Sequence, residues 1–139
     1  MTNDEELTKY MTLIEQYKDQ MSQLELQSQY INAAIGDYAK AKMTVEKLNN
    51  LESGNELLLP IGGSTFINAK ANDTSKVLID IGGGIVIEKK SEDAIKKIDK
   101  RIEDLQKTHE KLIQMIQNIQ AETSEIYSKA QKLMNNKED

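Results

Sequence analysis

The sequence predicts an α+β fold in which two long helices flank two β-hairpins. Three observations lead to this class. Apolar residues follow a heptad repeat in both end segments of the chain. Six of the seven glycines lie between Gly54 and Gly84, together with the only proline, Pro60. Aromatic residues make up 4% of the chain and tryptophan is absent, which favours a narrow coiled-coil seam over a large globular core.

The first long helix is expected over residues 1–53. Its apolar residues recur at alternating steps of three and four, which is the spacing of a coiled coil. They are Leu7, Tyr10, Ile14, Tyr17, Met21, Leu24, Ile31, Ile35 and Tyr38. Ser28 interrupts the series at an a position, and the phase is expected to slip beyond Tyr38. Asn3 and Glu6 have the spacing of a capping box at the start of this helix.

The second long helix is expected over residues 91–139, with a more regular heptad pattern. Its seam residues are Ile95, Ile98, Ile102, Leu105, His109, Leu112, Ile116, Ile119, Thr123, Ile126, Ala130 and Leu133. Each helix would run for about 45 residues, or roughly 65 Å. Two helices of equal length joined by a compact insert can zip antiparallel, so that residue x faces a residue numbered about 140 − x. Both termini would then lie at one end and the insert at the other.

The insert, residues 55–90, contains a repeat and is expected to form two β-hairpins. The stretch LLLPIGGSTFINAK from Leu57 aligns with VLIDIGGGIVIEKK from Val77. Each copy reads as a strand, a glycine turn and a second strand. A phosphate-binding loop would need a helix directly after its glycines, but a β-branched segment follows Gly84. We therefore interpret the glycines as turn residues with positive φ.

The strands of the insert are almost continuously apolar, which favours burial on both faces. Two-stranded units also have open edges that invite pairing with another chain. We therefore expect the insert to be an assembly module in which several chains pool their hairpins into a shared sheet or barrel. The alternative is a β-cap that packs only on the helices of its own chain.

Residues that carry chemistry are scarce. The chain has no cysteine and a single histidine, so we expect no disulfide and no metal site. His109 lies at a seam position, where a neutral, packed side chain is the plain interpretation. Nucleophile and nucleotide motifs are absent, so we expect no catalytic activity and no cofactor. The net charge is −5 and no segment is basic, which argues against binding to nucleic acid.

Targeting signals are equally scarce. No run of roughly 18 apolar residues exists, so we expect no membrane span. The acidic start MTNDEELTKY lacks the apolar core of a signal peptide. With no cysteine to oxidise, we expect a cytoplasmic location.

The free ends of the two helices are the second candidate surface. They hold the apolar residues Leu7, Tyr10, Met11, Leu13, Ile14, Ile126, Tyr127, Leu133 and Met134. Met11, Leu13, Tyr127 and Met134 lie off the seam, and apolar side chains there are exposed unless a partner covers them. Two interpretations stay open: these residues bind a partner, or they broaden the seam at its tip.

The arrangement resembles the α-class subunit of prefoldin, of the archaeal type. The residues that carry this resemblance are ELLLPIGGSTFINAKANDTSKVLIDIGGGIVIEKKSEDAI, from Glu56 to Ile95. The glycine turns, the DTSKV turn and the following EKK are typical of that family, whereas the helices resemble it only in their pattern. Two hairpins, rather than the single hairpin of β-class subunits, place the chain in the α class.

The resemblance implies a hexamer of two α-class and four β-class prefoldin subunits. Its hairpins would join into a double β-barrel platform from which the coiled coils extend. The platform residues would be Leu57, Leu59, Ile61, Phe66, Ile67, Val77, Ile79, Ile81, Val86 and Ile87. The tip residues would hold unfolded polypeptide clients and pass them to a group II chaperonin without ATP. The alternative function is a structural adaptor or filament-forming scaffold that binds no client.

Overall fold

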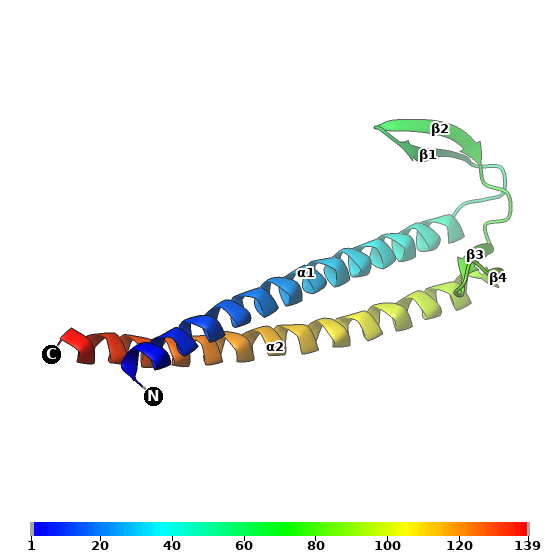
Figure 1. The fold of residues 1–139 in the computed structure, drawn as a ribbon. Helices are drawn as coiled ribbons and strands as arrows, with labels where there is room; N and C mark the ends of the chain where they lie inside the picture. The colour runs from blue at the N-terminus through cyan, green and yellow to red at the C-terminus, as the bar shows by residue number, and fades with distance from the viewer. Residues whose placement is uncertain (1, 139) are drawn as a thin grey trace. The chain divides into compact units, whose positions relative to one another are not determined.

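The computed structural model of the chain describes residues 2–138 and confirms two long helices with two β-hairpins between them (Figure 1). The elements are α1 (Asn3–Asn49), β1 (Glu56–Gly62), β2 (Thr65–Lys70), β3 (Lys76–Asp80), β4 (Val86–Lys90) and α2 (Ser91–Glu138). The chain divides into two compact units. The tip unit contains Met1–Ala34 and Leu105–Asp139, and the hairpin unit contains Ile35–Asp104.

Helix α1 is capped one residue earlier than the sequence predicts. The N–H of Glu5 donates to the hydroxyl of Thr2 at 3.3 Å, and the N–H of Thr2 donates to the Glu5 carboxylate at 3.4 Å. This reciprocal pair is a capping box, so the expected pair of Asn3 and Glu6 is wrong by one position. Both pairs have the same spacing, and the β-branched hydroxyl of Thr2 serves as the cap.

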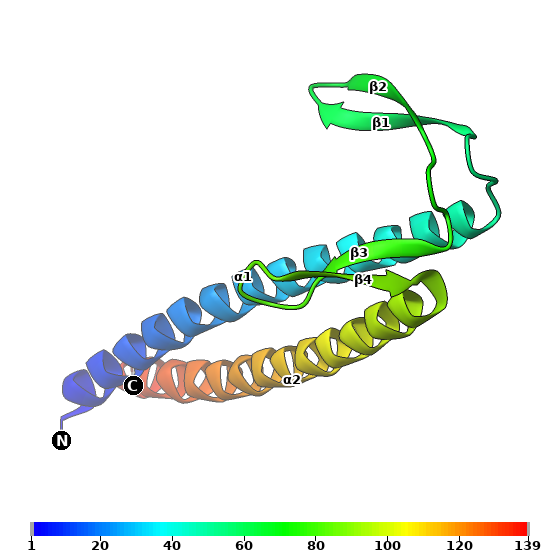
Figure 2. The ribbon, with the colours of Figure 1, turned by 90° about the vertical axis from the view of Figure 1, so that its right-hand side faces the viewer.

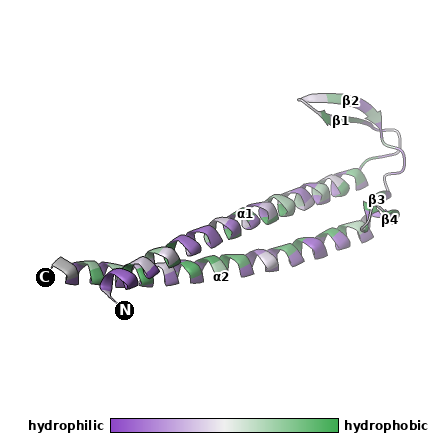
Figure 3. Ribbon diagram, in the orientation of Figure 1, coloured by the Kyte–Doolittle hydropathy of each residue, from purple (hydrophilic) through white to green (hydrophobic). Residues whose placement is uncertain are grey.

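The seam between the helices is formed by the predicted heptad positions. In the tip unit Ile14, Ser28, Leu112, Ile116 and Ala130 are buried, and the other seam residues are half-buried. Figure 3 shows the corresponding recurrence of hydrophobic residues along both helices, with hydrophilic residues between them. Burial of this stripe, at about 25 cal/mol per Å², is the main force that holds the pair of helices together.

The heptad phase of α1 persists further than the sequence predicts. Lys42 and Val45 continue the a and d series beyond Tyr38, because Lys42 is half-buried and Val45 is buried. A lysine can occupy a seam position when its stem packs and its ammonium group reaches out to a partner. The ammonium of Lys42 lies 2.8 Å from the carboxylate of Asp99 on α2. The phase therefore changes only after Val45.

Each hairpin is a separate two-stranded antiparallel sheet (Figure 2). In the first, Leu59 pairs with Ile67 and Leu58 with Asn68. In the second, the equivalent pairs are Ile79 with Ile87 and Leu78 with Glu88. The first hairpin has an irregularity between Pro60 and Gly62, where the register shifts by one residue.

The glycine-rich turns have the positive φ angles that the sequence predicts. Gly82, Gly83 and Gly84 have φ of 122°, 61° and 77°. In the first hairpin Ser64 takes the place that Gly84 has in the second, and its φ of 56° is unusual for a residue with a Cβ. The carboxylate of Asp80 accepts a hydrogen bond of 2.8 Å from the N–H of Gly82. A strand follows each turn, as expected for hairpins.

Small residues connect the hairpins to the helix ends. The hydroxyl of Ser91, at the start of α2, donates to the carbonyl of Thr74 at 3.3 Å, and Ser91 is 2% exposed. The hydroxyl of Thr74 in turn donates to the carbonyl of Leu51, just after α1. Ala71 and Ala94 are also buried at this junction. The linker between the hairpins thus hydrogen-bonds to the first residue of α2 and to a residue just beyond the end of α1.

Membrane insertion of a helix has no support in the structure. Neither of the two helices, over the part of the chain described, has a stretch that is long and apolar enough to cross a bilayer.

Candidate functional site

The β-hairpins carry a large group of exposed apolar side chains. Leu58 and Leu78, which occupy equivalent places in the repeat, are 67% and 72% exposed. The group consists of Leu58, Leu59, Ile61, Phe66, Ile67, Leu78, Ile81, Ile85 and Val86. The group is divided between two separate sheets, and several exposed apolar side chains on so small a sheet indicate an interaction surface.

The ten residues predicted for the platform fall into two classes in the single chain. Leu59, Ile61, Phe66, Ile67, Ile81 and Val86 are exposed, whereas Leu57, Val77, Ile79 and Ile87 are half-buried. The prediction omitted Leu58, Leu78 and Ile85, which are among the most exposed. Strand residues alternate between two faces, but a continuously apolar strand does not reveal which face points outward. The role of all these residues in assembly stays a prediction.

Both hairpins have open edges. Each sheet of the described chain has only two strands, so every strand has one edge without a ladder of hydrogen bonds. Unpaired N–H and C=O groups along such an edge are a template for pairing with another strand. Open edges beside exposed leucine and isoleucine side chains suit assembly by strand addition.

The second hairpin lines a groove with the helices of the hairpin unit. Ile79 and Ile81 lie in this groove opposite Tyr38 of α1 and Ile98 of α2. The complete lining is Tyr38, Ile79, Asp80, Ile81, Gly82, Lys97, Ile98, Lys100, Arg101 and Asp104. Ile79, which lines this groove, is half-buried in the single chain, whereas Ile81 at its rim is exposed.

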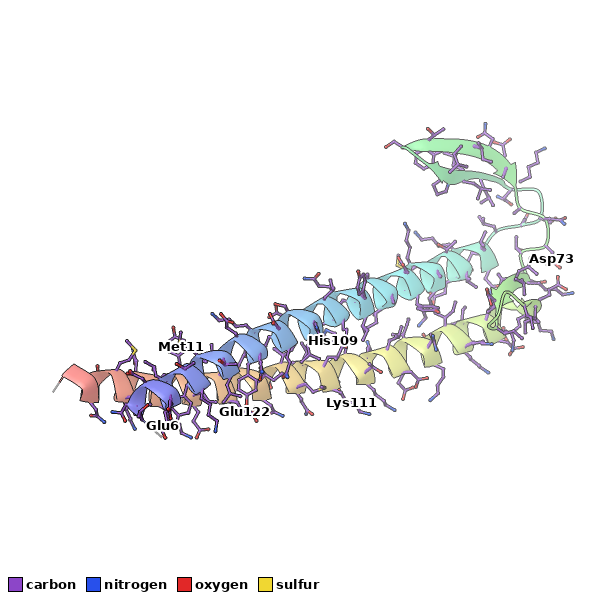
Figure 4. The ribbon with its side chains drawn as sticks, in the orientation of Figure 1. Glu6, Met11, Asp73, His109, Lys111 and Glu122 are labelled. Carbon is purple, nitrogen blue, oxygen red and sulfur yellow. The ribbon has the colours of Figure 1, made fainter. Side chains whose placement is uncertain are left out.

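The nine predicted tip residues also fall into two classes. Ile14 is 4% exposed and is part of the closed seam, where Leu7, Tyr10, Ile126 and Leu133 are half-buried. Off the seam, Leu13 is half-buried, whereas Met11, Tyr127 and Met134 are exposed by 56%, 55% and 52%. Figure 4 shows Met11 projecting from the surface of α1. Of the predicted set, these last three are open to a partner in this conformation.

The three exposed tip residues share one heptad position. Met11 on α1, and Tyr127 and Met134 on α2, each follow a d residue of their helix and are therefore e residues. Tyr127 also lines a shallow groove between the helices. The groove is lined by Lys18, Met21, Gln120, Thr123, Ser124, Tyr127, Ser128 and Gln131, of which only the lysine is charged. The apolar tip surface is thus on the e side of each helix.

Polar contacts between side chains join the two helices in both units of the described chain. In the tip unit the hydroxyl of Tyr17 hydrogen-bonds to the Glu122 carboxylate, and this bond raises the pKa of Tyr17 above its ordinary value. The hydroxyl of Ser28 lies 2.9 Å from Nε2 of His109, which Figure 4 shows between the helices. In the hairpin unit the hydrogen bond to Asp99 raises the pKa of Lys42.

Several exposed apolar residues of the helices were not predicted as part of a site. They are Leu26, Tyr30, Met43 and Met115. Heptad analysis could have found Leu26 and Tyr30, because both occupy outward positions on α1. Their exposure shows that apolar surface is not confined to the tips.

The acidic residues of the chain form no metal centre in the part that the structure describes. No group of three or more histidine, aspartate or glutamate side chains converges there. The carboxylates instead form i,i+4 ion pairs along the helices, such as Lys100 with Asp104 at 3.5 Å. Solvent-exposed pairs of this kind contribute little to stability.

Comparison with known proteins identifies relatives over most of the chain. Residues 17–136 match the family model described as Prefoldin subunit. The chain is 30% identical over 129 residues to prefoldin subunit alpha of Methanococcus aeolicus, which covers 93% of this chain and 85% of that protein. It is 30% identical over 104 residues to prefoldin subunit alpha of Nitrosopumilus maritimus, with coverage of 73% and 68%.

A solved structure supports the same fold. The cryo-EM structure of filamentous PFD from Methanocaldococcus jannaschii aligns with a TM-score of 0.61 and covers 91% of this chain and 98% of that chain. The sequence identity is 24%, so this likeness shows the fold alone.

Proposed function

We propose a chaperone function from one premise: the chain belongs to the prefoldin family and is an α-class subunit of it. The proposed function is that of an ATP-independent holdase. The chain assembles through its hairpins with β-class prefoldin subunits, as a hexamer of two α-class and four β-class chains. Its tips bind non-native polypeptide in the cytoplasm and deliver it to a group II chaperonin. We expect no catalytic activity.

One observation carries this proposal: both the hairpin unit and the tip unit present exposed apolar side chains. The hairpins present leucine and isoleucine side chains beside open strand edges, which supports assembly. The tip unit presents Met11, Tyr127 and Met134, which supports contact with apolar segments. Methionine is unbranched and flexible, so it can adapt to varied partners.

Weak contacts at the tips would suffice because several tips act together. A fully buried apolar side chain contributes about 1.5–3 kcal/mol, and ordering costs reduce the net affinity of one tip. Linking several tips on one platform raises the overall affinity by roughly 10²–10⁴. A client would then be held without a single tight site, and its release would need no ATP.

The tip contact can be tested by substitution within the intact assembly. We expect the triple variant Met11→Ser, Tyr127→Ser, Met134→Ser to lose most of its ability to suppress aggregation of a denatured protein, measured by light scattering. The matched control is Leu26→Ser, Tyr30→Ser, Met43→Ser, which removes equally exposed apolar side chains elsewhere on α1. Equal protection by both variants would overturn the tip mechanism.

Assembly is tested by native mass measurement of the same samples. We expect a hexamer when the chain is mixed with a β-class subunit, and a dimer or ill-defined oligomers when it is alone. Long polymers on electron micrographs without suppression of aggregation would instead indicate a scaffold. Calorimetry with millimolar ATP should show no heat of binding.

A further inference from the structure

In the tip unit Ser28 and His109 form a polar pair across the two helices in which both residues occupy seam positions. Ser28 interrupts the apolar series of α1 and His109 interrupts that of α2, and they meet at 2.9 Å. Ser28 is 8% exposed and His109 is half-buried. The hydroxyl and Nε2 can exchange the roles of donor and acceptor, so the bond forms with either tautomer. Each helix thus contributes one polar side chain to the seam, and the two side chains face each other.

We infer that Ser28 and His109 set the register of the two helices in the tip unit and thereby align the residues at their tips. A polar residue at a seam position is a known means of fixing register, because it costs little only when it finds its partner. The inference extends beyond the proposed function, since it concerns helix alignment and does not depend on client binding.

Alternative registers leave both groups without their partner. A slip of one heptad would place Ser28 opposite Ile102 or Ile116, and His109 opposite Met21 or Ile35. None of these four side chains can replace the lost hydrogen bond except weakly through the methionine sulfur. Most remaining seam residues are aliphatic, so they would pack almost as well after a slip.

Other contacts discriminate less between registers. The Tyr17–Glu122 bond and the Lys42–Asp99 pair also cross between the helices, but both involve carboxylates that are open to solvent. Solvent and salt weaken such contacts. The hydrogen bonds of Thr74 and Ser91 tie the helix ends within the hairpin unit, not within the tip unit. The Ser28–His109 pair, with a buried hydroxyl and a half-buried imidazole, is therefore the strongest determinant of register in the tip unit.

The tips depend on this alignment. A slip of one heptad moves α2 along α1 by about 10 Å. Met11 would then be displaced by that distance relative to Tyr127 and Met134, and the groove that contains Lys18 and Tyr127 would be lined differently. The polar pair therefore positions residues that lie several helical turns away.

Register can be measured by crosslinking because the chain has no cysteine of its own. The in-register pair is Tyr17→Cys with Glu122→Cys, and the shifted pairs are Tyr17→Cys with Met115→Cys or with Lys129→Cys. A short bismaleimide should join the in-register pair at least about tenfold more than either shifted pair, because a slip leaves the buried Ser28 hydroxyl and the half-buried His109 ring without a partner. The same three pairs are then placed in the double variant Ser28→Leu, His109→Leu.

We expect the double variant to be more heat-stable than the wild-type chain. In this variant the crosslinking yield of the shifted pairs should come within about threefold of the yield of the in-register pair. Thr123→Val is the matched control, because the Thr123 hydroxyl at the seam donates to Ile119 of its own helix at 2.7 Å. This control should keep a single register. If the leucine variant fails to fold, as judged by circular dichroism, Ser28→Ala with His109→Leu replaces it. A single in-register crosslink in a folded double variant overturns the inference.

Discussion

The two β-hairpins have nearly the same sequence pattern but differ in what covers them. Leu59 and Ile67 of the first hairpin are exposed, whereas the equivalent Ile79 and Ile87 of the second are half-buried. The second hairpin lines a groove with Tyr38 and Ile98 of its own helices. The comparison teaches that a repeat fixes which residues share a face, whereas the neighbouring elements decide how much of that face remains open.

The largest expected effect comes from making the same polar change in each hairpin. Leu59→Ser with Ile67→Ser should prevent assembly with a β-class subunit but leave the thermal unfolding of the isolated chain nearly unchanged. Ile79→Ser with Ile87→Ser should impair assembly and also destabilise the chain by about 1–3 kcal/mol, since it removes half-buried side chains.

Native mass measurement and circular dichroism melting distinguish these two outcomes. The two double variants are matched, because each removes one cross-strand pair from the same place in the repeat. Equal losses of melting temperature in both variants would show that the two hairpins are covered to the same extent.

A smaller effect is expected from exchanging the turn residues. Gly84 has φ of 77°, and a Cβ added there would meet no atom within 4 Å, so Gly84→Ser meets strain only from its backbone conformation. It should cost about 1 kcal/mol. Ser64→Gly relieves the φ of 56° but gains freedom in the unfolded chain, so its net effect should be less than about 1 kcal/mol.

Melting temperatures of the two single variants and of the exchanged double variant provide the measurement. The changes in melting temperature of the two single variants should add up to the change in the double variant, because the turns belong to separate sheets. A larger loss for Ser64→Gly than for Gly84→Ser would contradict the backbone explanation.

The smallest effect concerns the linker between the hairpins. The carboxylate of Asp73 accepts hydrogen bonds from the Ser75 hydroxyl at 2.6 Å and from the Ser75 N–H at 2.9 Å. These bonds, and the nearby Lys76, hold the pKa of Asp73 below its ordinary value of 3.8. A lowered pKa means that the carboxylate stabilises the fold above that ordinary value and that this contribution is lost as the pH falls below it.

We therefore expect the melting temperature of the wild-type chain to fall more between about pH 5 and pH 3 than that of Asp73→Asn. The asparagine variant keeps an acceptor oxygen but cannot titrate. Parallel pH profiles of the two proteins would show that the turn does not depend on the charge of Asp73.

The heptad positions of the helices could be predicted almost completely from the sequence. Every predicted seam residue from Leu7 to Tyr38 and from Ile95 to Leu133 is buried or half-buried. The sequence could not show that Lys42 occupies the seam, because a charged residue there depends on Asp99 being within reach. Burial of a long side chain is decided by its partner, which only the paired structure supplies.

The sequence also could not predict that Ser28 pairs with His109, because the pairing depends on the register of the two helices. Both residues stood out as exceptions in their seams, but the expected pairing of x with about 140 − x places Ser28 opposite Leu112. That is nearly one helical turn from its partner. In the hairpins, Leu58, Leu78 and Ile85 were missed because their strands are apolar on both faces. Exposure there depends on which elements pack nearby.

The residues that line the shallow groove of the tip unit bear on how contacts there respond to salt. Gln120, Ser124, Ser128 and Gln131 present amides and hydroxyls beside Met21 and Tyr127, and Lys18 supplies the single charge. Dissolved ions screen contacts between charges, but they weaken dispersion and neutral hydrogen bonds much less. If clients bind at the tips as we propose, contacts made at this groove should depend little on salt concentration.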